Sequence, residues 1–241
     1  MNIAEIIESG NQFIDLLRSD ENGRYKSWEH CYSAFSEYKG QTLTGADIDF
    51  LSLHLSFYLA SWGMYRGSSF LLQKDYKVHA VAIKELMKVE YLPMWAIKCE
   101  SYIESSNNLD RLFSLTNALK EIYRSIRISA NTAINRNIPA HPISDTLISK
   151  ILMGTLGCVP AYDRFFNSGV KKNGVASTLY NSKGILNLAM FYVENIDEFE
   201  NWRLSISSKS VEYPQMKILD MCFWQIGYNL YASKSEDMWN E

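Results

Sequence analysis

A carboxylate that follows a glycine turn is the feature of this sequence best suited to chemistry. Asp163 comes after Gly154, Gly157 and a proline. The glycines allow close approach of the backbone, and the proline fixes the chain where the next helix begins. A carboxylate on such a rigid element can stabilise an oxocarbenium-like sugar cation and orient an attacking water, as cleavage of an N-glycosidic bond requires. The alternative is that Asp163 only caps the helix and pairs with Arg164.

The turn itself could hold a phosphate. A hairpin at Gly154 and Gly157 would expose backbone N–H groups, and Lys150 lies close before it. Such a turn is suited to gripping one phosphate of a DNA backbone. Arg164 would add a cation to the same contact. On this interpretation the turn positions the DNA and Asp163 faces a sugar.

A second predicted anion site begins a helix expected over residues 69–90. Arg66 and Ser69 flank its N-terminus, where free backbone N–H groups favour an anion such as phosphate. The alternative is an ordinary turn whose arginine pairs with a carboxylate. If a base is bound here, Arg66 and Gln73 could read it or a sugar attached to it. The remaining predicted substrate contacts are Tyr65, Lys74, Tyr162 and Asp220.

Each of these contacts has a structural alternative. The tyrosines could belong to the core, since aromatic residues make up 13% of the chain. Asp220 lies in an otherwise apolar helix and could instead form a buried ion pair. Arg124 and Arg127 share one helix face and are predicted to contact a DNA backbone, although cations are also favoured at a helix C-terminus without any function.

The elements that must position these residues are helices. Apolar residues recur at helical spacing through most of the 241 residues, and strand-like alternation is scarce. The sequence therefore predicts an all-α protein of about nine or ten helices in one globular domain, 1–241. The run near 135–143 contains two prolines and marks where the domain would divide into two lobes with a cleft between them.

Composition narrows the functional classes. The net charge of −3 gives no overall basic field, and the four cysteines and four histidines show no metal-binding spacing. No metal or cofactor is therefore predicted. The N-terminus lacks a signal-peptide pattern, and no apolar run is long enough to cross a membrane. We expect a cytoplasmic monomer with no membrane partner.

The segment 144–166 resembles the helix-hairpin-helix DNA glycosylase superfamily. The resemblance rests on an apolar helix with Lys150, then Gly154 and Gly157, then the run VPAYDR that contains Asp163. It departs from the family because the Leu-Pro-Gly-Val-Gly hairpin is absent and Lys150 precedes the turn. The resemblance implies a helical enzyme that binds DNA, flips a base into a pocket between two lobes and cleaves its glycosidic bond with Asp163.

The hypothesis that follows is a monofunctional DNA N-glycosylase that leaves an abasic site. Because the hairpin departs from the family, a special substrate is expected, such as modified bases in phage DNA, with a role in antiviral defence. Two alternatives remain open from the residues alone. One is a non-enzymatic helical interaction or regulatory protein, and the other is a helical enzyme that acts on a phosphorylated small molecule or nucleotide.

Overall fold

The computed structural model describes residues 2–133, 142–208 and 211–239, and its regular structure there is entirely helical. This confirms the all-α class. The α-helices are α1 (Ile3–Arg18), α2 (Ser27–Glu37), α3 (Gly45–Ser61), α4 (Ala80–Leu86), α5 (Cys99–Glu104), α6 (Ser106–Ala133), α7 (Asp145–Thr155), α8 (Arg164–Asn173), α9 (Ser182–Glu194), α10 (Ile196–Ile206) and α11 (Gln215–Trp239). Short 3-10 helices are η1 (Arg24–Lys26), η2 (Phe70–Gln73), η3 (Tyr76–His79) and η4 (Val89–Met94).

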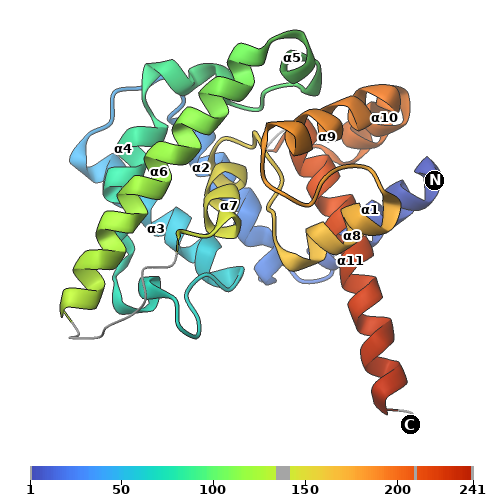
Figure 1. Ribbon diagram of the computed structural model, residues 1–241, viewed down its shortest axis with the longest axis horizontal. Coiled ribbons are helices and arrows are strands. Elements are labelled where there is room, and N and C mark those ends of the chain that lie inside the picture. The colour runs from blue at the N-terminus through green and yellow to red at the C-terminus, as the bar shows by residue number, and fades with distance from the viewer. Residues whose placement is uncertain (1, 134–141, 209–210, 240–241) are drawn as a thin grey trace.

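Helix α7 lies in the middle of the molecule (Figure 1). Helices α2, α3, α4 and α6 lie on one side of it, and α1, α8, α9, α10 and α11 lie on the other. Helix α11 packs along α8 and α1, while α5 packs against α9 and so joins the two groups. One hydrophobic core runs through both groups, and every residue from 147 to 162 is buried within it. The segment singled out by its chemistry is thus the centre of the fold.

Two helices begin where the sequence contains a residue type that favours the N-cap position. Thr44 and Asp47 form a capping box at the start of α3, and Ser144 accepts a hydrogen bond from the Leu147 N–H at the start of α7. Eleven α-helices within the described residues slightly exceed the nine or ten expected. Residues 135–141 of the expected lobe boundary lie outside the described residues.

The helix predicted over 69–90 is wrong, because the chain there forms η2, η3 and only seven residues of α4. Two side chains compete with the helical hydrogen bonds. Ser69 accepts from the Leu71 N–H, and Asp75 accepts from the Lys77 N–H. Lys74 between them is extended. The expected anion site therefore lacks the long helix whose N-terminus would have formed it.

Helices α8 and α11 cross at two reciprocal glycine contacts. A methyl group at Gly169 would lie 2.0 Å from the Phe223 carbonyl oxygen, and one at Gly227 would lie 1.9 Å from the Phe165 carbonyl oxygen. Each glycine lies four residues after the phenylalanine on its own helix. Only a residue without a side chain permits this backbone approach. The crossing fixes the first turn of α8, which Asp163 caps.

Replacing Gly227 with alanine should destabilise the protein by about 3 kcal/mol, because the added methyl group forces the α8 and α11 backbones apart. Urea denaturation of the variant measures this as a lowered midpoint. Gly45→Ala is the matched control, since no heavy atom lies within 4 Å of the added carbon there. Equal midpoints for the two variants would show that the crossing is not tightly packed.

Candidate functional site

Buried hydrogen bonds fix the segment that leads to Asp163. The Ala161 N–H donates to the Asp220 carboxylate at 3.0 Å. The Tyr162 N–H donates to the Ser149 hydroxyl at 2.9 Å, and its carbonyl accepts from the Thr146 hydroxyl at 2.8 Å. These bonds tie an extended segment to α7 on one side and to α11 on the other. Asp163 thus directly follows a segment that buried hydrogen bonds hold to two helices.

Both carboxylate oxygens of Asp163 have partners. Oδ1 accepts from the Phe165 and Phe166 N–H groups, at 3.0 and 3.1 Å, which makes Asp163 the N-cap of α8. Oδ2 lies 3.3 Å from Lys150 Nζ. The exposed fractions of the two side chains are 13% for Asp163 and 5% for Lys150, so Asp163 is the more accessible partner of the pair. Arg164, the partner expected in the structural alternative, instead packs over the Phe165 and Tyr231 rings.

Lys150 brings the loop after α3 to Asp163. Its ammonium donates to the Trp62 carbonyl at 2.9 Å and lies 5.9 Å from the centre of the Trp62 ring. Burial lowers the pKa of Lys150, Asp163 opposes that shift, and Arg66 reinforces it as a nearby cation. Trp62, Arg66, Lys150 and Asp163 therefore form one cluster.

A wall of aromatic rings extends from this cluster. The Trp224 ring contacts the Tyr25, Trp62, Phe165 and Tyr228 rings, with centroid distances between 5.3 and 6.1 Å. Trp224 is buried and the other four are half-buried. We call the four half-buried rings the aromatic wall. It combines η1, the loop after α3, α8 and α11, so no local signal in the sequence could have identified it.

Three exposed arginines lie beside the aromatic wall or beside Lys150. Arg24 packs over the Tyr25 and Trp62 rings at 5.2 Å each, and Arg164 packs over Phe165 at 4.5 Å. Arg66 folds back over Gly63 beside Lys150. We call Arg24, Arg66 and Arg164 the arginine rim. The rim contributes three cations on a chain whose net charge is −3, and Arg24 was not predicted.

Asp220 was predicted to bind substrate, and the structure places it in the buried ion pair of the structural alternative. Its carboxylate lies 2.9 Å from Lys217 Nζ, and the exposed fractions of the two side chains are 4% and 2%. The ammonium also packs over the Phe13 and Trp28 rings. Burial raises the pKa of Asp220, and Lys217 opposes that shift. Asp220 therefore holds the segment before Asp163 and lies out of reach of a substrate.

The glycine turn does not form a phosphate grip. Gly154 and Gly157 are both buried, as is Lys150. The Gly157 N–H donates to the Leu152 carbonyl, and the space where a Gly154 side chain would lie is filled by the Tyr58 ring. Gly157 has a φ of 65°, so its glycine ends α7 in a left-handed conformation. The sequence signal was a helix C-cap rather than a DNA contact.

Tyr162 is buried in the core, and its hydroxyl has no hydrogen-bond partner among the described residues. Ser69 caps η2, Gln73 is exposed at the end of η2, and Lys74 follows it.

The two predicted arginines of α6 lie apart from these contacts as well. Arg124 pairs with Glu121 on the same helix at 3.1 Å, and Arg127 is half-buried. Their assignment to a DNA backbone stays a prediction.

Tyr65 belongs to a hydrogen-bonded row rather than to the aromatic wall. Its hydroxyl lies 2.8 Å from His79 Nε2, and the Tyr123 hydroxyl lies 2.6 Å from His79 Nδ1. A neutral histidine satisfies this arrangement by donating from one nitrogen and accepting at the other. Burial lowers the pKa of His79 from its ordinary 6.5 to about 3. The row anchors Tyr65, and with it the loop that carries Arg66.

His79 makes stability dependent on pH. The unfolded chain binds a proton at this histidine below about pH 6.5 and the folded chain does not until about pH 3, so stability falls as the pH drops through that window. We expect a loss of about 1.4 kcal/mol per pH unit from this group. Urea midpoints between pH 7 and 4 measure it. His79→Gln should have a shallower slope than the wild type, and exposed His30→Gln should not; equal slopes for both variants would contradict the assignment.

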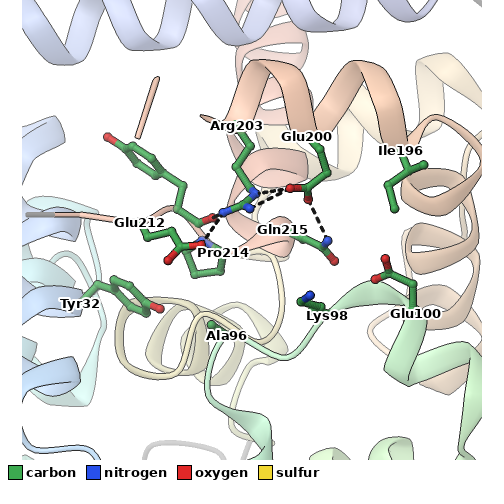
Figure 2. Close-up of a pocket in the computed structure, with 11 residues that line it drawn as sticks. Tyr32, Ala96, Lys98, Glu100, Ile196, Glu200, Arg203, Glu212, Pro214 and Gln215 are labelled. Atoms are coloured by element: carbon green, nitrogen blue, oxygen red, sulfur yellow. Dashed lines mark hydrogen bonds and ion pairs between the residues drawn. The ribbon is translucent and has the colours of Figure 1, made fainter. Parts of the chain in front are cut away.

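A separate pocket of about 340 Å³ lies at the C-terminal end of α7 (Figure 2). Its lining residues Tyr32 and Pro214 pack against Gly157, whereas Asp163 pairs with the middle of the helix. Figure 2 shows charged side chains converging on it from α10, from the segment before α11 and from the start of α5.

The charges of this pocket do not suit a phosphate. Arg203 donates to Glu200 at 2.7 and 2.9 Å and to Glu212 at 2.9 Å, so its guanidinium is already paired. Three carboxylates (Glu100, Glu200 and Glu212) line the pocket against two cations. The pocket is therefore negatively charged overall, and we do not assign the DNA contact to it.

In the described part of the chain, no group of three or more histidine, cysteine, aspartate or glutamate residues could hold a metal ion. The four cysteines are buried and unpaired. Among the described helices, none combines the length and the apolar character that a membrane crossing requires.

Comparison with protein-family models, curated proteins and solved structures finds no significant match to this chain. The resemblance to helix-hairpin-helix glycosylases therefore stays a prediction, and function has to be inferred from the chemistry of the site itself.

Proposed function

We propose that the protein is a DNA glycosylase-like hydrolase that acts on a base flipped out of the duplex. The observation that carries this proposal is Asp163. Its carboxylate is held on one side by two N–H groups at the start of α8 and on the other by Lys150, and the Asp163 side chain remains 13% exposed. A fixed carboxylate at a partly enclosed surface is what stabilisation of a sugar cation requires.

The proposed reaction breaks the bond between the sugar C1′ and the base nitrogen. The bonding electrons leave with the base, which takes up a proton, and positive charge develops on the sugar. The Asp163 carboxylate stabilises that charge and orients a water, whose oxygen bonds to C1′ as it loses a proton. The products are a free base and an abasic site.

The arginine rim is the proposed contact to the DNA backbone, in place of the glycine turn. Arg24, Arg66 and Arg164 are exposed, and each packs on or beside the cluster that contains Asp163. Guanidinium groups bind phosphate oxygens in a two-pronged geometry. A rim of three would place the DNA backbone around the carboxylate.

The aromatic wall is the proposed surface for the unstacked base. A base taken out of the duplex loses its stacking partners, and aromatic side chains replace them by about 1–3 kcal/mol per base. Tyr25, Trp62, Phe165 and Tyr228 remain partly accessible beside the rim. A modified base, including one from phage DNA in an antiviral role, is the proposed substrate class.

Lys150 is proposed to position Asp163 rather than to attack the sugar. Its ammonium is occupied by the Trp62 carbonyl and by Asp163, and its side chain is 5% exposed. We therefore expect base release without strand cleavage, and no covalent adduct when borohydride is added during the reaction. A borohydride-trapped adduct that disappears in Lys150→Arg would show instead that the enzyme is a lyase.

The test uses purified protein and duplex oligonucleotides that carry unmodified, oxidised, hydroxymethylated or glycosylated bases. Abasic sites are counted as strand breaks that appear only after hot alkali. We expect such breaks at one class of modified base and none on unmodified DNA. Cleavage of free nucleotides in place of DNA, or no release from any substrate, would overturn the proposal.

A further inference from the structure

Helix α3 presents a row of apolar side chains to solvent, bordered by Asp49, whose side chain is 46% exposed. After Gly45, its exposed residues are Ala46, Phe50, Leu53, Phe57 and Ala60. The exposed fractions of the three large ones are 42% for Phe50, 53% for Leu53 and 57% for Phe57. The opposite face, which includes Leu51, Leu55 and Tyr58, is buried in the core. Apolar rows on two opposite faces of one helix are normally both covered by protein.

The spacing of the exposed residues fits a second helix. They follow one another at intervals of four, three, four and three, which is the a and d pattern of a coiled-coil seam. The seam runs the length of a 17-residue helix, which is about 25 Å. Core-facing helices of a single domain use a broader stripe, and this one faces away from the core.

The sizes of the seam residues identify the partner as a second copy of α3, running antiparallel. In antiparallel seams an a residue packs against a d residue of the partner. With Leu53 opposite the partner's Phe57, Phe50 lies opposite the partner's Ala60, and twofold symmetry repeats both contacts. Large residues then face smaller ones, as interdigitating layers require. A parallel pair would place each phenylalanine against its own copy.

Charge favours the same orientation. The acidic residues of α3, Asp47 and Asp49, both lie near its N-terminus. A parallel pair would bring both copies of each carboxylate to one end, where Lys77 offsets only Asp49, at 3.1 Å, and an antiparallel pair separates them. We propose that the protein forms a twofold dimer through α3, in contrast to the monomer expected from the sequence.

The size of the seam sets the strength of the dimer. Its three large residues together expose roughly 300 Å² on each copy, judged from the area an aromatic residue buries. A stable interface needs about 800 Å² on each partner. The dimer should therefore be weak and depend on concentration. It is independent of the glycosylase proposal, since no residue of the seam belongs to the candidate site.

Analytical ultracentrifugation of the full chain, from low micromolar to near-millimolar concentration, tests the dimer. We expect the mass to rise from one chain to two. Leu53→Lys should remain a single chain throughout, because it places charge within the seam. Val89→Lys, a matched control at a 79% exposed residue on η4, should dimerise like the wild type. A wild type that stays monomeric at the highest concentration would overturn the proposal.

Disulfide trapping tests the orientation. The four native cysteines are buried, so introduced ones dominate oxidation. A mixture of Leu53→Cys and Phe57→Cys proteins should cross-link several-fold more than either protein alone, because residue 53 faces the partner's 57. Efficient cross-linking of Phe57→Cys alone would indicate a parallel pair and contradict the proposed arrangement.

Discussion

Replacing Asp163 with asparagine should reduce base release by about a hundredfold to a thousandfold, as loss of one electrostatic stabiliser does in other enzymes. Asparagine is as good an N-cap as aspartate, so the first turn of α8 should persist. What is lost is the negative charge that faces the sugar and pairs with Lys150. The rate of abasic-site formation under single-turnover conditions measures the effect.

Asp145→Asn is the matched control for this variant. Asp145 also lies at the start of a helix and also pairs with a lysine, since its carboxylate lies 2.6 Å from Lys120 Nζ. It is not part of the Asp163 cluster, so its loss should leave the rate unchanged. Undiminished base release by Asp163→Asn would remove Asp163 from the reaction, whatever the control shows.

Replacing Lys217 with methionine should produce the largest loss of stability, about 3–5 kcal/mol, because it leaves the Asp220 carboxylate buried without a counter-charge. Burial already raises the pKa of Asp220, and removal of Lys217 should raise it further. The folded variant then holds a proton that the unfolded chain releases. Its deficit should therefore shrink as the pH falls towards 5, which urea titrations at several pH values would measure.

Two comparisons separate charge from packing in that prediction. Adding Asp220→Asn to Lys217→Met removes the unpaired charge and keeps an acceptor for the Ala161 N–H, so the double variant should be more stable than the single one. Lys88→Met makes the same change at a surface pair with Glu85 and should alter stability little. A double variant no more stable than Lys217→Met would contradict the charge explanation.

Local features of this fold could be predicted from the sequence, because they depend on neighbours in the chain. The caps at Thr44 and Ser144 and the placement of Asp163 at the start of a helix are of this kind. The prediction of a long helix over 69–90 was wrong, and the reason for that is also local. The Ser69 and Asp75 side chains accept hydrogen bonds from the backbone N–H groups of Leu71 and Lys77. These bonds outweigh an apolar periodicity that is typical of a helix.

The site depended on contacts that the sequence does not encode locally. Lys150 was assigned to a phosphate because it lies near two glycines, yet the turn of α7 directs it inward to Asp163. Arg24 and Tyr25 reach Trp62 from η1, and Trp224 reaches it from α11. Such contacts depend on how whole helices pack. The composition therefore indicates that aromatic residues are plentiful, but it does not indicate which of them lie near Asp163.

Mass spectrometry of the low-molecular-weight products is the most direct test of the proposed function. Wild-type protein and Asp163→Asn are each incubated with DNA that carries the modified base on which abasic sites form. The proposed chemistry predicts one free base released for each abasic site formed by the wild type, and almost none with the variant. Equal release by both proteins, or abasic sites without a free base, would contradict it.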